Sequence, residues 1–281
     1  MLRIARQGSA AWAIAACALL GSLAYPAAAQ TMTPAPDSAA RGALFTRTDA
    51  WIAGGTVLGA AALMTADRGI TDEFRDPGPQ HSGFLHGAAT DFNWLGDPGT
   101  VVLSLGFYGA GRLGHRPHLA ELGLRGAEAI VVSAAATGLV KGAVGRQRPS
   151  VNEGDPDDFS LGAGFGRAGH TSFPSGHATA AFALASVAAT ELSSWYPHSR
   201  RVLVPAVYGT AAMVALARVY SAKHWSSDVL AGAGIGTLSG LLVMRFHALH
   251  PHSGFDRVLL GARPMVTGAR GIGMGWRIAT H

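Results

Sequence analysis

Six uncharged apolar segments, separated by residues that break helices, constrain the fold of this chain more than any other feature. The segments are rich in Ala, Gly and Leu, which favours helices over the Val- and Ile-rich strands of a buried sheet. Stretches such as DPGPQHSG and GDPG lie between them and predict turns and loops. The segments cover residues 50–66, 98–111, 129–140, 178–190, 202–217 and 229–244. The sequence therefore predicts an all-α fold, a bundle of six helices.

Charge is scarce in this chain. Charged residues (DEKR) make up 14% and hydrophobic residues 48%, which indicates a membrane protein or an unusually apolar helical protein. The net charge of +5 comes mainly from scattered Arg residues, because Lys141 and Lys223 are the only lysines. The sequence lacks a basic cluster interleaved with aromatic residues, so we expect no nucleic-acid partner. A basic chain suits an anionic substrate or an anionic membrane surface, and membrane association is expected on this ground.

The first 29 residues have the pattern of a signal peptide. Arg3 and Arg6 precede the apolar run AAWAIAACALLGSLA, and three alanines at 27–29 offer a cleavage site. An uncleaved anchor, or a lipid on Cys17 in the lipobox-like IAAC, are the alternatives. Because Cys17 is the only cysteine, cleavage would leave a mature chain with neither disulfides nor thiolate ligands.

The rest of the chain divides into three regions. These are a polar lead-in over 30–48, a helical domain over 49–248 and a tail over 249–281. In the tail, apolar residues alternate with others in IGMGWRI after a TGARG turn, which predicts a short β-hairpin.

The segment KGAVGRQRP lies where the third predicted helix stops. It places Lys141 and Arg148 close together. The point charge of the lysine and the planar guanidinium of the arginine suit a tetrahedral oxyanion. A basic helix end stabilised by the helix dipole is the alternative interpretation.

The tetrapeptide PSGH opens the fourth predicted helix. The Ser175 hydroxyl and the small Gly176 would let free backbone N–H groups approach an anion at this helix start. His177 then lies in the first turn, where it could act as a proton donor or simply pack.

The segment ARVYSAKHWSSD joins the fifth and sixth predicted helices. His224 and Asp228 are four residues apart, so on a helix they would share one face. Asp228 could then accept the Nδ1 proton of His224 and leave Nε2 free as a nucleophile. A surface ion pair is the alternative, but two ionisable groups at the start of an uncharged apolar helix are costly without a purpose.

Together these segments resemble the type 2 phosphatidic acid phosphatase and vanadium haloperoxidase superfamily. Its pattern is Lys-x6-Arg-Pro, then Pro-Ser-Gly-His, then Ser-Arg-x5-His-x3-Asp, and the elements occur in that order across residues 141–228. One position departs, because Ala217 stands where the pattern has Ser. The resemblance implies a six-helix bundle with the motifs at the helix ends.

The resemblance also implies the role of each site residue. His224 would attack phosphorus and form a phosphohistidine, Asp228 would orient it, and His177 would protonate the leaving group and then activate water. The residues expected to hold the phosphate oxygens are Lys141, Arg148, Ser175, Gly176 and Arg218. No metal or other cofactor is expected, and the twelve histidines show no HExxH spacing.

The sequence thus predicts a metal-independent phosphatase that hydrolyses phosphate monoesters or pyrophosphates, on lipid or soluble substrates. A vanadium haloperoxidase is one alternative, in which His224 would ligate vanadate as the cofactor. A non-enzymatic membrane protein is another, although it would not need the complete His/His/Asp set.

The location follows from a topology argument. The resemblance implies a site facing away from the cytoplasm, which for six true spans requires the chain before residue 50 to be cytoplasmic. A cleaved signal would place that part outside instead. Short predicted helices and frequent Gly favour export to the periplasm, as a soluble or membrane-associated enzyme of the cell envelope, and an integral membrane protein is the alternative.

Overall fold

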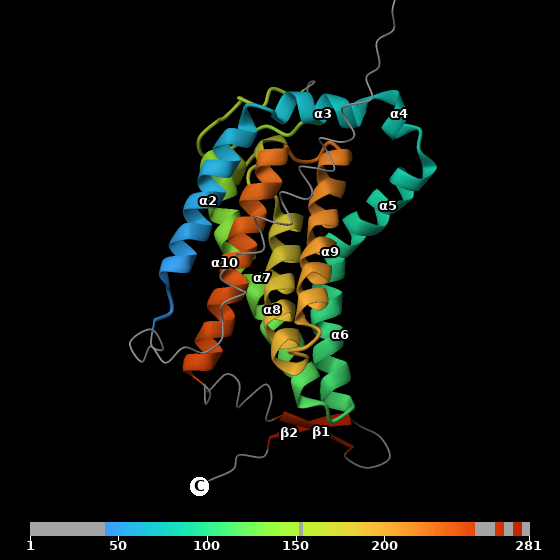
Figure 1. The fold of residues 1–281 in the computed structure, drawn as a ribbon, viewed down its shortest axis with the longest axis vertical. Coiled ribbons are helices and arrows are strands. Elements are labelled where there is room, and N and C mark those ends of the chain that lie inside the picture. The colour runs from blue at the N-terminus through green and yellow to red at the C-terminus, as the bar shows by residue number, and fades with distance from the viewer. Residues whose placement is uncertain (1–42, 152–153, 251–261, 267–271, 277–281) are drawn as a thin grey trace, which may run out of the picture.

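The computed structural model describes residues 43–151 and 154–250, together with the backbone of 262–266 and 272–276. The predicted signal peptide therefore lies outside the described residues. Six long helices correspond to the six apolar segments and stand side by side in Figure 1. They are α2 (Arg47–Met64), α6 (Thr100–Leu113), α7 (Pro117–Val144), α8 (Gly176–Trp195), α9 (Arg200–Tyr220) and α10 (Ser226–Leu249).

The predicted number of helices is too small, because residues 67–94 are also helical. They form α3 (Asp67–Arg75), α4 (Pro77–Gln80) and α5 (Gly83–Trp94), followed by the π-helical turn η3 (Leu95–Gly99). Figure 1 shows these helices crossing the upper end of the bundle and descending beside α9. The prediction missed them because α3 is highly charged, yet Ile70 and Phe74 on it still pack against the main core.

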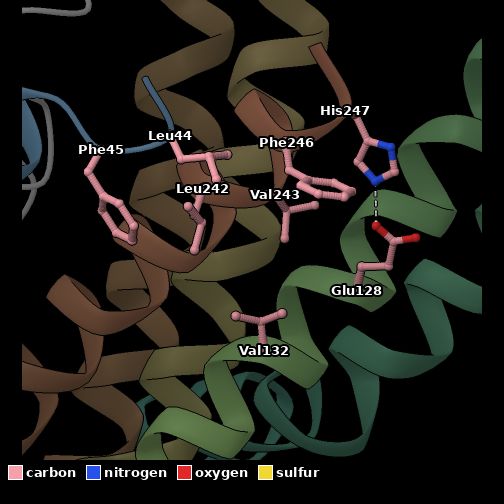
Figure 2. Close-up of a pocket in the computed structure, with 8 residues that line it drawn as sticks. All are labelled: Leu44, Phe45, Glu128, Val132, Leu242, Val243, Phe246 and His247. Carbon is pink, nitrogen blue, oxygen red and sulfur yellow. Dashed lines mark hydrogen bonds and ion pairs between the residues drawn. The ribbon is translucent and has the colours of Figure 1, made fainter. Parts of the chain in front are cut away.

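Helix α7 is much longer than its uncharged segment. Its N-terminal half carries charged side chains that are paired inside the bundle: Arg125 contacts Glu191 of α8, and Glu128 contacts His247 of α10 at 2.5 Å (Figure 2). Because these pairs satisfy the charges, the helix continues through residues that interrupt the apolar pattern. It ends at Gly145, whose positive φ of 60° is typical of a helix C-terminal cap.

Helices α8 and α10 form the centre of the bundle and approach each other closely. A Cβ atom on Gly236 of α10 would lie 2.2 Å from the Thr179 carbonyl oxygen of α8, so only glycine fits there. The core around this contact contains Phe182 of α8 and Tyr208 of α9, whose hydroxyl lies 2.9 Å from Ser186 Oγ. The Ala- and Gly-rich composition thus serves tight helix packing.

Three helices in the described part of the chain are long and apolar enough to cross a membrane, namely α7, α9 and α10. The pair α2 and α3, bent by 64°, would make a fourth. Large apolar side chains are exposed along the bundle, among them Trp51, Leu58, Val131, Leu139 and Val202. These features indicate a membrane-associated protein.

The order of the helices brings the three motifs to one end of the bundle. Helices α2, α7 and α9 end there and α6, α8 and α10 begin there, since consecutive long helices run in opposite directions (Figure 1). In the tail, β1 (Ala262–Val266) pairs antiparallel with β2 (Ile272–Trp276), with Ala262 opposite Trp276.

Candidate active site

The predicted site residues come from four long helices and the turns beside them. Lys141 lies in the last turn of α7 and Arg218 in the last turn of α9. Ser175 is the N-terminal cap of α8, and Gly176 and His177 are its first residues. His224 precedes α10, Asp228 lies in its first turn, and Arg148 lies in the segment after α7.

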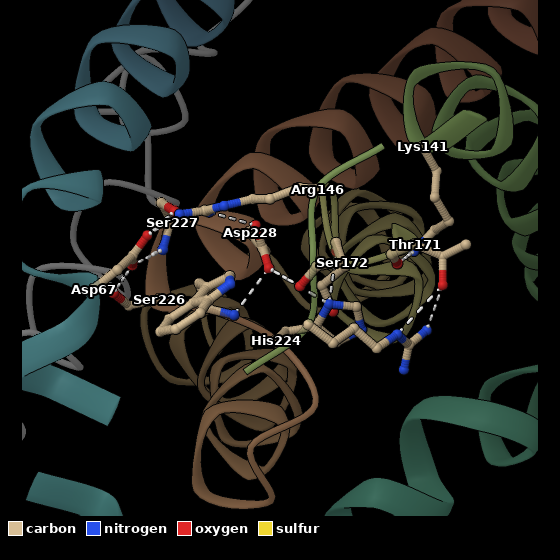
Figure 3. A network of polar contacts seen from close by, with 12 residues as sticks. Asp67, Lys141, Arg146, Thr171, Ser172, His224, Ser226, Ser227 and Asp228 are labelled. Carbon is tan, nitrogen blue, oxygen red and sulfur yellow. Dashed lines mark hydrogen bonds and ion pairs between the residues drawn. The ribbon is translucent and has the colours of Figure 1, made fainter. Parts of the chain in front are cut away.

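His224 is buried and its ring is held from the Nδ1 side. Nδ1 lies 2.7 Å from the carbonyl oxygen of Ser172, which can only accept, so Nδ1 carries the proton and Nε2 keeps its lone pair (Figure 3). The predicted direct bond to Asp228 is not formed, because Asp228 Oδ2 lies 3.8 Å from Nδ1. The backbone carbonyl of Ser172 therefore sets the tautomer of His224.

Asp228 positions His224 indirectly, through the neighbouring residues Trp225 and Ser172. The two residues do not share a helix face as predicted, because α10 begins only at Ser226. Asp228 Oδ2 instead accepts hydrogen bonds from the backbone N–H of Trp225 at 2.8 Å and from the Ser172 hydroxyl at 2.5 Å. It thereby fixes the turn that carries His224 and the residue that bonds to the ring.

Both histidines are neutral at pH 7 in the empty site. The pKa of His177 is lowered to about 3, mainly by burial and additionally by the charges of Arg218, His224, Arg148 and Lys141. Burial also lowers the pKa of His224 to about 4, although the Asp228 carboxylate opposes the shift. These effects show that the two imidazoles and the three cations lie within electrostatic reach of one another.

The three cations are held by residues outside the predicted set. Lys141 Nζ donates to the Thr171 carbonyl oxygen at 2.6 Å, and Arg148 Nη2 donates to the Thr171 hydroxyl at 3.0 Å. Arg218 Nη1 donates to Asn93 Oδ1 at 2.7 Å. Each cation has more N–H donors than these bonds use, which leaves donors for an anion.

Two buried polar atoms at this site have no hydrogen-bond partner among the described residues. They are the hydroxyl oxygen of Ser175, whose side chain is fully buried, and Nε of Arg218. Leaving such groups unpaired costs about 1–3 kcal/mol each unless a ligand pairs with them. The backbone N–H groups of the first turn of α8 point out of the same helix end.

Comparison with known proteins supports the resemblance that the motifs indicate. Residues 123–250, which contain all three motifs, match the PAP2 superfamily. Over these residues the chain is similar to that superfamily.

Two relatives extend the comparison. A lipid A 1-phosphatase from Porphyromonas gingivalis is 39% identical over 74 residues, which are 25% of this chain and 15% of that protein. A transmembrane PAP2 type phosphatidylglycerolphosphate phosphatase from Bacillus subtilis has a similar crystal structure, with a TM-score of 0.55. The match covers 74% of this chain and 98% of that one at 22% identity, so it shows a shared fold.

The sequence analysis missed several residues that support the candidate site. Arg146 was visible inside KGAVGRQRP but received no role, and Asp67, Asn93, Thr171 and Ser172 lie in segments where no motif was found. Asp67 and Asn93 lie between the predicted helices at 50–66 and 98–111, where the sequence predicted no helix. A buried Asp at the sharp bend between α2 and α3 leaves no pattern in the sequence, because its partners lie far along the chain.

Proposed function

We propose that this protein is a metal-independent phosphatase that hydrolyses phosphate monoesters or pyrophosphates through a phosphohistidine. The observation that carries the proposal is the unpaired Ser175 hydroxyl, which lies at the start of the helix that also bears His177. Three cations lie within electrostatic reach of His177 near this helix N-terminus, and a tetrahedral dianion bound here would use these donors together. No metal is needed for the charge, because Lys141, Arg148 and Arg218 supply it.

In the first step, Nε2 of His224 attacks phosphorus while the bond to the leaving oxygen breaks. His177 gives its proton to that oxygen as the phosphohistidine forms. A bound phosphate dianion offsets the cations that lower the pKa of His177, so the ring can take up a proton when substrate is present. In the second step, neutral His177 removes a proton from water, the oxygen attacks phosphorus, and the P–N bond breaks to release phosphate and regenerate His224.

A lipid phosphate is the substrate class that the surroundings of the site favour. Both named relatives act on lipids, and the helices that carry Lys141, Arg218 and Asp228 are among those apolar enough to cross a membrane. We further propose that the enzyme belongs to the cell envelope, with the site on the periplasmic side. Cell fractionation with a carbonate wash tests the membrane association directly.

Phosphate release by the purified protein in detergent tests the function. We expect turnover of phosphatidic acid and p-nitrophenyl phosphate in the presence of EDTA, and competitive inhibition by orthovanadate, a phosphate mimic. Loss of activity on chelation that a divalent ion restores would contradict metal independence. Vanadate-dependent oxidation of bromide without phosphate release would identify a haloperoxidase instead, and inactivity in both assays would favour a non-enzymatic protein.

A further inference from the structure

A fully buried arginine, Arg146, lies behind the proposed nucleophile and has no role in the phosphatase mechanism described above. Its five N–H donors are all occupied, and its guanidinium lies 5.1 Å from the ring centre of Phe159 and 5.5 Å from that of Trp225. Two of the donors bond to the Pro156 carbonyl oxygen, at 2.9 and 2.7 Å. The side chain is therefore held on every side, which is unusual for a residue without a function.

Arg146 contacts both residues that hold His224. Its Nη1 donates to Asp228 Oδ1 at 2.7 Å, on the side of the carboxylate opposite Ser172 (Figure 3). Its backbone carbonyl accepts from the N–H of Ser172 at 3.0 Å, and the Ser172 carbonyl in turn faces His224 Nδ1. A displacement of Arg146 would therefore shift the imidazole in two ways, through Asp228 and through Ser172.

A second carboxylate completes the arrangement. Asp67, the first residue of α3, is fully buried and accepts from Arg146 Nη2 at 2.8 Å. Its Oδ1 also accepts hydrogen bonds from the first residues of α10, from the Ser226 hydroxyl at 2.5 Å and the Ser227 backbone N–H at 2.9 Å. Its Oδ2 accepts from the Ser227 hydroxyl at 2.5 Å. Asp67 therefore links the bend after α2 to the start of the helix that follows His224.

We infer that Arg146 and Asp67 are positioning residues for the proposed nucleophile, His224. Arg146 holds Asp228 and Ser172 in place, and Asp67 holds Arg146 and the start of α10. A charged network of this kind in the interior stabilises a protein weakly or not at all compared with apolar packing, so a role in geometry better explains it. This inference rests on the proposed function, since it concerns the same imidazole.

Arg146→Lys is the main test, because it keeps the charge and loses the planar fork. We expect kcat to fall by about 10- to 100-fold, the range for outer partners of a functional imidazole, with KM changed less than about threefold. Arg245→Lys is the matched control. Arg245 forms a two-bond ion pair with Asp49 that joins α10 to the start of α2, far from the site, and its replacement should leave kcat unchanged.

Arg146→Met tests whether the positive charge of Arg146, and not only its geometry, affects His224. The groups facing His224 are Asp228, Lys141, Arg148 and His177. Without Arg146, the Asp228 charge is no longer neutralised and should raise the pKa of His224, so the acid limb of kcat/KM should move to higher pH. In Arg146→Lys the acid limb of kcat/KM should not move, because the positive charge next to Asp228 is kept. Asp67→Asn, which keeps one oxygen acceptor, should lower kcat in the same direction as Arg146→Lys.

Kinetics are normalised to folded sites, counted by vanadate binding, so that poor folding is not mistaken for slow chemistry. The inference is overturned if Arg146→Lys and Arg245→Lys have equal kcat per folded site. It is also overturned if Arg146→Met lowers only the yield of folded protein and leaves kcat and the acid limb unchanged. Should Arg146→Met not fold, Arg146→Lys and Asp67→Asn decide the question. A wild-type enzyme without phosphatase activity would instead contradict the proposed function itself.

Discussion

The two halves of the bundle treat buried polar groups differently. At the motif end, carboxylates, cations and imidazoles from α3, α7, α8, α9 and α10 gather in one network. Towards the other end, the pair Glu128–His247 lies in the wall of a pocket of about 420 Å³ whose other lining residues are apolar (Figure 2). In the described structure, polar residues within the apolar helices thus gather at the candidate site in one half and pair neighbouring helices in the other.

An unpaired atom alone does not distinguish these two regions. Glu128 Oε1 is buried without a partner in the described structure, just as Ser175 Oγ is. The difference lies in the surroundings. Ser175 caps the N-terminus of the helix whose His177 lies within electrostatic reach of three cations, whereas the residues that line the pocket beside Glu128 include Leu, Val and Phe side chains. A functional site is therefore recognised by convergence of donors around an empty position.

The largest expected effect comes from removing the proposed nucleophile. His224→Ala should lower kcat by at least about a thousandfold with unchanged helical content, because no other nucleophile is held at this position. Phosphate release and circular dichroism measure the two quantities. Residual activity above about one part in a thousand would contradict the role of His224.

A smaller and selective effect is expected for His177→Ala. An alkoxide needs a proton to leave whereas p-nitrophenolate does not, so turnover of alkyl or lipid phosphates should fall by about 10²–10⁴-fold. Initial release of p-nitrophenol should fall much less. Because the same ring activates water in the second step, the phosphohistidine should accumulate and be trappable at alkaline pH.

The control for this prediction is the comparison of the two classes of substrate, which differ in their leaving group. If both classes of substrate slowed equally and no phosphoenzyme could be trapped, His177 would be a packing or binding residue.

The pH dependence of stability should also distinguish the motif end. The pKa values of His177 and His224 are lowered to about 3 and about 4, so the unfolded chain binds more protons than the folded one below about pH 6.5. Stability should therefore fall as the pH drops from about 6.5 to about 4. Thermal unfolding at a series of pH values measures this stability. In His177→Asn, stability should depend less on pH than in the wild type. A curve identical to that of the wild type would contradict the shift at His177.

The sequence predicted the long helices better than the contacts within the candidate site. The apolar segments and the three motifs depend on residues close together in the chain, which a pattern can reveal. The partner of His224 Nδ1 could not be predicted in this way, because a backbone carbonyl such as that of Ser172 carries no residue-specific signal. Asp67 and Arg146 are 79 residues apart, and their contact exists only once α3 crosses the end of the bundle.

The smallest effect is expected at the other end of the bundle. Glu128 is 13 residues before Lys141, about 20 Å along α7 at the helical rise of about 1.5 Å per residue. Glu128→Gln keeps an oxygen to bond with His247 Nε2 and removes only the charge. We expect kcat and KM to stay within about twofold of the wild type.

Stability should fall slightly in the same variant, by about 1 kcal/mol, because Glu128 is partly exposed and an amide replaces a charged acceptor. Thermal unfolding in detergent and the phosphatase assay measure these quantities on one preparation. Arg146→Lys in parallel provides the contrast, since it alters a buried polar contact of the motif end. If Glu128→Gln lowered kcat tenfold, the pocket would be coupled to the chemistry, and the division of the bundle into a functional and a structural half would be wrong.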